Sequence, residues 1–176
     1  MVFNETQKIY NILKEHEKRI KELERIVSRL MGKEERETEE AKIVANFQKF
    51  SRKTGIDIPV LKRLFDVEER EITLLKIIGD STKEKVQNIT LVILLAYKHL
   101  FDMEEVLAHE IRRNVAELGV SLNNFSRHLN EIKPRFIRRK GKPKSPRTVY
   151  KLTMEGEIKA REILRNLSEI YGGEAK

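Results

Sequence analysis

The stretch EIRRNVAELGVSLNNFSRHLNEI, residues 110–132, contains two amphipathic segments separated by a glycine. The first segment predicts a helix over residues 103–118 that closes at Gly119 in a left-handed C-cap. Ser121 is expected to cap the second helix, which covers residues 122–132. Two helices joined by such a short glycine turn have the outline of a helix-turn-helix.

The second of these helices is expected to separate a core face from a polar face. On a helical wheel the apolar residues fall on one side, namely Leu122, Phe125, Leu129 and Ile132. The other side carries the candidate base-reading residues, Asn123, Asn124, Arg127 and Asn130. Asn can pair with adenine and Arg with guanine through two hydrogen bonds, and each such pair discriminates by roughly 1 to 3 kcal/mol. The alternative is that these groups only solvate an exposed helix.

The excess of positive charge lies just after this helix. Residues 131–176 account for +7 of the net charge of +8, and nine residues between positions 131 and 151 are basic while one is acidic. Such a concentrated positive field attracts polyphosphates. Two β-prone segments, 136–137 and 148–152, flank the basic run RRKGKPKSPR. They predict a hairpin with a positively charged tip.

The candidate contacts to a DNA backbone are polar and basic residues of the second helix, its start and this hairpin. They are Ser121, Ser126, His128, Lys133, Arg135, Arg138, Arg139, Lys140, Lys142, Lys144 and Arg147. Cationic side chains here would neutralise phosphates, and the tip loosely resembles basic hooks that insert into a minor groove, with Lys where Arg is usual. The alternative is a solvated basic loop without a partner.

Two capping pairs predict the helices that begin before this stretch. Ser81 with Glu84 opens a long helix whose residues 89–95 are apolar on nearly every face, so this helix must be central. Asp102 with Glu105 repeats the pair at the start of the next helix.

The order of helix, helix, glycine turn, helix, basic hairpin and a final helix capped by Thr153 resembles the winged helix domains of MarR-type and ArsR-type prokaryotic regulators. The resemblance covers about residues 88–171 and rests on residues 110–132 and on VYKLTMEGEIKA, which includes the second strand of the hairpin. It implies a recognition helix, 121–132, in the major groove and a wing, 135–151, on the backbone or the minor groove. It also implies dimers that bind paired half-sites.

The first helix carries a heptad pattern, with a spacing that alternates between four and three residues from Ile9 to Leu30. The residues expected to form a dimer seam are Leu13, Ile20, Leu23, Val27 and Leu30. The a positions are Leu13, Ile20 and Val27, and the d positions are Ile9, His16, Leu23 and Leu30. Mostly β-branched residues at a and mostly Leu at d favour a parallel two-stranded coiled coil, whereas the alternative is an amphipathic helix packed on its own domain. Gly32 is expected to end the helix, and the glutamate-rich residues 32–40 to form a solvated linker or an exposed helical turn.

Three short helices are predicted between this linker and the central helix, over residues 41–54, 57–66 and 67–78. The stretch FSRKTGIDIPVLKRLF has a weak helix-turn-helix outline, in which Lys62 and Arg63 would contact DNA. A plain helical packing module is the alternative.

The fold class predicted for the 176 residues is therefore mainly α. It comprises a coiled-coil dimerisation helix (1–31), a charged linker (32–40), a small helical module (41–80) and a C-terminal winged helix domain (81–173) with a short β-hairpin wing. The final helix packs on this domain or forms a second dimer contact.

Composition excludes several functional classes. The chain has no Cys, so Cys-ligated zinc, iron–sulfur clusters and thiol catalysis are excluded. Its four His residues are scattered, and no HExxH, GxSxG or phosphate-binding loop occurs. Neither an enzyme nor a cofactor or metal is expected, and no apolar run is long enough to span a bilayer. The high charge of 36% and the absence of Cys and Trp are common in proteins from hot environments.

These patterns predict a dimeric, sequence-preferring protein that binds double-stranded DNA, most simply a transcription regulator, located in the cytoplasm on the nucleoid. One alternative is a protein-interaction adaptor that uses the winged helix and the coiled coil as docking surfaces. Plasmid or viral partition and replication proteins are further alternatives within DNA binding. Charge distinguishes the DNA-binding proteins from the adaptor, because an adaptor has little use for so basic a segment.

Overall fold

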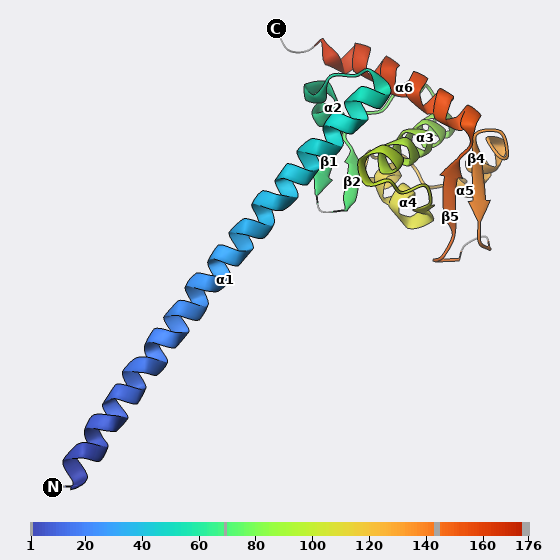
Figure 1. Cartoon of the computed structure of the whole chain (residues 1–176). Helices are drawn as coiled ribbons and strands as arrows, with labels where there is room; N and C mark the ends of the chain where they lie inside the picture. Colours follow the sequence, from blue (N-terminus) through green and yellow to red (C-terminus); the bar gives the residue numbers. More distant parts are fainter. Residues whose placement is uncertain (1, 69, 143–144, 174–176) are drawn as a thin grey trace. The chain divides into compact units, whose positions relative to one another are not determined.

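A computed structural model describes residues 2–68, 70–142 and 145–173, with the side chains of residues 2–12 and 28–40 left undescribed. The chain is mainly helical, as predicted, and holds two small antiparallel sheets (Figure 1). None of the described helices is both long enough and apolar enough to cross a membrane.

The chain divides into two compact units, Met1–Lys42 and Ile43–Lys176. Helix α1 (Val2–Thr54) runs through the first unit and into the second. The helix end predicted at Gly32 is wrong, because residues 32–40 are helical. One glycine in a helix interior costs only about 1 kcal/mol relative to alanine, and the Lys, Glu and Arg residues around it are good helix formers.

Helix α1 ends at Thr54 as predicted, because Gly55 takes a left-handed φ of 74°. Helix α2 (Ile58–Leu64) begins after Asp57, close to the predicted start, and carries a proline in its first turn. Its residues Leu61 and Leu64 are buried. Lys62 and Arg63, which lie between them, therefore belong to a helix whose apolar side is buried in the core.

The helix predicted over residues 67–78 is wrong. Strands β1 (Phe65–Glu68) and β2 (Glu71–Leu74) form an antiparallel hairpin there, in which Phe65 pairs with Leu74 and Val67 with Ile72. β-Branched residues fit a pleated strand better than a helix, and the buried side chains alternate along β2 with a period of two.

Helix α3 (Thr82–Phe101) is the centre of the second unit, where it contacts α4, α5, α6, β2 and β5 (Figure 1). Its predicted cap is confirmed, because the Ser81 hydroxyl accepts a hydrogen bond from the Glu84 N–H at 3.2 Å. All residues from Leu91 to Tyr97 are buried, as expected of a central helix.

The capping role predicted for Asp102 and Glu105 is wrong. Asp102 instead ends α3 in the left-handed region, with φ 55°. Strand β3 (Val106–Leu107) follows and pairs with β5, so α4 (Ala108–Glu117) begins five residues later than residue 103. Asp tolerates the left-handed region better than most residues, which allows it to end a helix rather than start one.

The predicted hairpin and final helix are confirmed. Strands β4 (Ile137–Lys140) and β5 (Val149–Leu152) pair antiparallel, and the sheet order is β3–β5–β4. Helix α6 (Met154–Gly172) begins after Thr153, whose hydroxyl accepts from the Gly156 N–H at 3.0 Å. Figure 1 shows α6 starting beside the base of this hairpin and crossing α3.

The start of α6 is fastened to the chain just before β4. The Thr153 hydroxyl donates to the Arg135 carbonyl at 2.5 Å, and the Thr153 N–H donates to the Phe136 carbonyl at 3.0 Å. A Cβ atom added to Gly156 would lie 1.8 Å from the same Phe136 oxygen. Glycine at this position therefore allows the helix to approach the hairpin closely.

One hydrophobic core joins the parts of the second unit. It contains Phe47 and Phe50 of α1, most of α3 and the buried side of α6. The apolar side of α6 is buried at Ala160, Ile163, Leu164 and Leu167, whereas Ile170 is 54% exposed. Residues 43–80 and 81–173 thus share a single core.

Candidate nucleic-acid interface

Helix α5 (Phe125–Glu131) is shorter than predicted and begins three residues later than residue 122. Asn124 precedes it with a left-handed φ of 59°, and the Ser121 hydroxyl accepts from the Asn123 N–H at 3.2 Å. Residues 121–124 therefore form a turn, which Asn stabilises because it tolerates the left-handed region, and the helix cap predicted at Ser121 is wrong. Leu122, which was expected in the core, is 38% exposed.

The division of α5 into two faces is observed. Phe125, Leu129 and Ile132 are buried, and α5 packs on α3. The four candidate base-reading residues are all exposed: Arg127 and Asn130 lie on the helix, and Asn123 and Asn124 lie in the turn before it. Asn130 accepts a hydrogen bond from the Lys133 ammonium group at 3.1 Å.

The other helix candidates differ in accessibility. Ser121 is exposed and Ser126 is half-buried. His128 is half-buried, and its Nδ1 atom is buried without a hydrogen-bond partner within the described part of the chain. Its backbone carbonyl accepts from the side chain of Gln87 on α3 at 2.9 Å, so this residue faces the interior more than the polar face.

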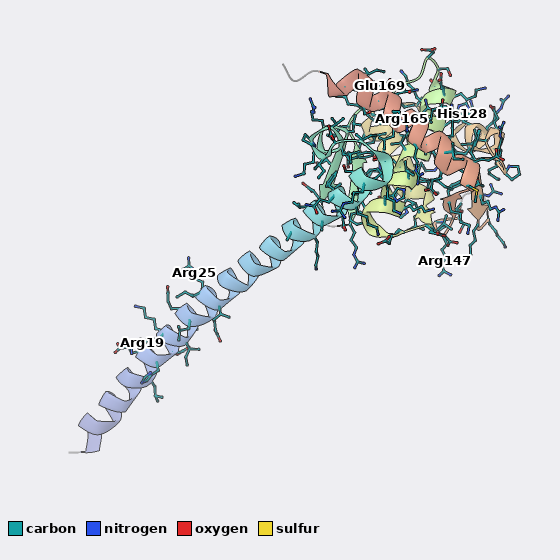
Figure 2. The ribbon with its side chains drawn as sticks, turned by 45° about the horizontal axis from the view of Figure 1, so that its top comes forward. Arg19, Arg25, His128, Arg147, Arg165 and Glu169 are labelled. Atoms are coloured by element: carbon teal, nitrogen blue, oxygen red, sulfur yellow. The ribbon has the colours of Figure 1, made fainter. Side chains whose placement is uncertain are left out.

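The β4–β5 hairpin carries its basic residues outside the core. Ile137 and Tyr150 are buried, while Arg138, Lys140, Lys142 and Arg147 are exposed and Arg139 is half-buried. Figure 2 shows Arg147 extending away from the ribbon. Lys144 lies outside the described residues.

The tip of the hairpin has a defined turn at its start. Gly141 takes φ 102°, and the Thr148 hydroxyl donates to the Lys142 carbonyl at 2.6 Å. Only glycine adopts this φ readily, so the turn that begins the tip requires glycine at position 141.

Three of the basic candidates already have polar partners. Arg135 contacts Glu155 at 2.8 Å, Lys140 contacts Glu105 at 3.5 Å, and Lys133 donates to Asn130. Burial lowers the pKa of Lys133, and the positive charge of Arg139 acts in the same direction. Exposed ion pairs contribute only about 0 to 1 kcal/mol, so a phosphate can replace either carboxylate at little cost.

Arg112 is a residue that the sequence analysis did not single out. Its guanidinium carbon lies 4.5 Å from the centre of the Phe125 ring, which places a cation of α4 against α5. On the helical wheel Arg112 borders the buried pair Ile111 and Val115. A long side chain at such a border can reach a neighbouring element, and this position is the sequence feature that could have indicated the contact of Arg112 with α5.

An open hollow of about 450 Å³ lies between α4, α5 and the hairpin, and we term it the hairpin hollow. Its lining includes Arg112 and His109 of α4, Ser126 of α5, and Arg139 and Tyr150 of the hairpin. Burial raises the pKa of the Tyr150 phenol, although the positive charges of Arg139 and Arg112 oppose that shift. The phenol thus stays neutral near pH 7 and can donate a hydrogen bond.

No family model, curated protein or solved structure matches this chain. Its chemistry must therefore be inferred from its own residues. Within residues 13–27, 41–68, 70–142 and 145–173, where side chains are described, no group of three or more His, Asp and Glu residues could hold a metal ion.

The predicted dimer seam lies on α1. Leu13, Ile20, Leu23 and Val27 are helical and between 51% and 61% exposed, whereas the side chain of Leu30 lies outside the described residues. Arg19 and Arg25 extend from the same helix at other heptad positions (Figure 2). A row of exposed apolar side chains along a helix is typical of a surface that binds a partner.

Proposed function

We propose that the C-terminal part of the chain is a winged helix domain and that the protein is a dimeric, sequence-preferring duplex DNA-binding protein, most simply a transcription regulator. One observation carries the proposal: the exposed polar face of α5 is followed directly by a hairpin whose exposed side chains are basic. The order α3, β3, α4, α5, β4, β5, α6 supports the resemblance to MarR-type and ArsR-type domains.

In this proposal α5 enters the major groove. Arg127 and Asn130 meet base edges, with Asn123 and Asn124 at the start of the helix. The buried face of α5 on α3 supports this role, because a reading helix must be held firmly from behind. Arg127 would contribute to discrimination by binding guanine through two hydrogen bonds, and Asn130 by pairing with adenine in the same way.

The β4–β5 hairpin lies on the DNA backbone or in the minor groove in the same proposal. Arg138, Lys142 and Arg147 are exposed there, and none has a carboxylate within 4.0 Å among the described side chains. They are therefore available to neutralise phosphates. Arg135 and Lys140 would exchange their glutamate partners for phosphates on binding.

The seam on α1 pairs two copies of the chain as a coiled coil. Burial of Leu13, Ile20, Leu23 and Val27 against the same residues of a second copy would remove four exposed apolar side chains from water. Helix α6 offers a second contact, because Met154 and Ile158 are 83% and 64% exposed. A dimer would bind paired half-sites, and DNA binding would place it on the nucleoid in the cytoplasm.

The decisive experiment measures the anisotropy of a labelled random-sequence duplex titrated with the protein at several salt concentrations. The proposal predicts tight binding whose logarithmic salt slope is about −0.9 for each phosphate neutralised. The variant Arg138→Gln/Arg147→Gln should flatten the slope by up to about two such units. The charge-matched control Arg25→Gln/Arg165→Gln removes two exposed arginines of α1 and α6 and should leave the slope unchanged.

Absence of binding at low salt would contradict DNA binding. The exposed seam of α1 would then favour the adaptor alternative, in which the hairpin docks on an acidic protein. An equal loss of slope in both double variants would show that net charge, rather than the hairpin, governs binding.

A further inference from the structure

Two neighbouring arginines of α4 have opposite surroundings. Arg113 contacts three carboxylates, those of Glu71 and Glu110 at 3.0 Å and that of Glu117 at 3.6 Å. Arg112 has no carboxylate within 4.0 Å among the described side chains, and it stacks on Phe125 instead. The charge of Arg113 is therefore used within the fold, whereas that of Arg112 is available to a ligand.

The ligand chemistry follows from the lining of the hairpin hollow. Arg112 and Arg139 come from different elements, α4 and β4, and line the same hollow. The positive charge of each lowers the pKa of the same Tyr150 phenol. The hydroxyls of Ser126 and Tyr150 add hydrogen-bond donors, and the lining includes no carboxylate. Two guanidinium groups with hydroxyl donors and no acidic group complement an oxyanion, and phosphate is the oxyanion that Arg binds best.

We propose that the hairpin hollow receives one phosphate group of the DNA backbone, held by Arg112 and Arg139. This inference rests on the proposed function and deepens it. The hollow is open to solvent, so a phosphate can enter while both of its neighbouring nucleotides stay outside. Arg112 lies against Phe125, the first residue of α5, so a phosphate held there fixes the position of α5 along the duplex.

Arg112 has a role distinct from that of the hairpin tip. Arg138 and Arg147 are exposed and can neutralise any nearby phosphate, whereas the Arg112 side chain is half-buried and its guanidinium carbon lies 4.5 Å from the centre of the Phe125 ring. Loss of Arg112 should therefore remove one particular phosphate contact. Loss of an exposed tip residue should weaken binding without marking one phosphate.

The test uses the full chain and a short duplex that carries a preferred site selected from a random library. Methylphosphonates, which are neutral, replace the phosphates one at a time, and anisotropy gives the dissociation constant. With wild-type protein, one position in each half-site should weaken binding by about tenfold or more, since a charge-assisted contact is lost. The variant Arg112→Gln should bind the unmodified duplex about tenfold more weakly and show no further loss at that position.

A second variant and a control guard against misfolding. Arg139→Gln, from the other wall of the hollow, should lose the same methylphosphonate effect. Arg165→Gln removes an exposed arginine of α6 and should keep it in full. The melting temperatures of all three variants should match wild type. If only one of Arg112→Gln and Arg139→Gln folds, its methylphosphonate profile alone tests the phosphate site.

The outcomes separate the two proposals. Failure of wild-type protein to bind any duplex would overturn the proposed function. Duplex binding in which Arg112→Gln and Arg139→Gln keep every methylphosphonate effect would overturn only the phosphate site. Calorimetry with inorganic phosphate distinguishes the source: phosphate binding lost in Arg112→Gln, with no duplex binding, would assign the hollow to a free phosphate and overturn the DNA contact.

Discussion

The side-chain amide of Asn114 binds the edge of strand β2 as a neighbouring strand would: its oxygen accepts from the Leu74 N–H at 2.7 Å. Its nitrogen donates to the Ile72 carbonyl at 2.9 Å and to the Glu110 carbonyl at 3.1 Å. Asn114 is fully buried, so one side chain of α4 satisfies two backbone groups of a hairpin that lies about 40 residues earlier in the chain.

The first prediction is that Asn114→Ala destabilises the fold. The substitution leaves the Leu74 N–H buried without its partner, and an orphaned buried group costs about 1 to 3 kcal/mol, whereas the Ile72 carbonyl keeps the Arg113 guanidinium at 3.4 Å. Chemical denaturation should show a loss of that order in the free energy of unfolding. Asn166→Ala removes the same side chain from an exposed position of α6 and should change stability by less than about 0.5 kcal/mol. Equal effects of the two substitutions would refute the role of Asn114.

Glycine at position 156 supplies the second prediction. Alanine is normally better than glycine within a helix by about 1 kcal/mol. At position 156 its Cβ would collide with the Phe136 carbonyl, so Gly156→Ala should lower the free energy of unfolding by about 1 to 3 kcal/mol. At Gly172 the nearest atoms to an added Cβ lie 3.7 Å away, so Gly172→Ala should be neutral or slightly stabilising. A Gly156→Ala variant that melts at or above the wild-type temperature would contradict this account of the junction.

His99 gives the fold a dependence on pH. Burial lowers the pKa of His99 from its usual value of 6.5 and outweighs the attraction of Glu157, whose carboxylate lies 3.6 Å from Nε2. The positive charges of Arg161 and Lys98 also lower this pKa. Below about pH 6.5 His99 binds a proton in the unfolded chain but resists protonation in the folded chain. The free energy of unfolding therefore decreases as the pH is lowered.

The third prediction is therefore a melting temperature that falls between pH 7.5 and pH 5.5 in wild-type protein and falls less in His99→Gln. Thermal unfolding at both pH values gives the comparison. The matched control is His109→Gln, which removes an imidazole whose side chain is 62% exposed. The same slope in His99→Gln as in wild type would assign the pH dependence to other groups.

A fourth prediction concerns the seam of α1. Leu23→Asn places a polar group at a d position, 61% exposed in the single chain, and should shift the protein from dimer to monomer at micromolar concentration. Arg25→Asn, at the outward f position of the same heptad, should leave the dimer intact. Sedimentation equilibrium measures both masses. A monomeric wild-type protein, or a dimeric Leu23→Asn variant, would count against the coiled coil.

The fifth prediction tests base recognition. Arg127 is exposed on α5, so Arg127→Ala should leave the melting temperature unchanged. It should reduce the preference for a selected site over random duplex by about 1 to 3 kcal/mol in free energy. Competition titrations with both duplexes measure this ratio. Unchanged discrimination would remove Arg127 from the reading face, whereas equal weakening of both duplexes would make it a backbone contact.

The sequence predicted those helix ends that are set by residues within a few positions of the end itself. The caps at Ser81 and Thr153 and the helix-ending glycines at positions 55 and 119 all act over a few residues, and each prediction is confirmed. The helix predicted over residues 67–78 failed because the strands there depend on distant partners. Strand β2 is held by Asn114 and by Tyr97, neither of which can be read from the strand itself.

The candidate interface shows the same division. The two faces of α5 follow from helical periodicity, so Phe125 and Arg127 lie where the sequence placed them. The role of Arg112 depends on which element its side chain meets. Arg112 and Arg113 are adjacent in the sequence, and only the tertiary fold gives them different partners, Phe125 for Arg112 and Glu110 for Arg113.

Helix α4 is anchored at both of its ends by elements outside it. At its start the Ala108 N–H donates to the Thr148 carbonyl next to β5, and towards its end Asn114 binds β2. A helix fixed at two points has little freedom to rotate or slide, so Arg112 between them is preorganised. Its charge would meet a phosphate with a smaller loss of side-chain entropy than an exposed lysine such as Lys142 would suffer.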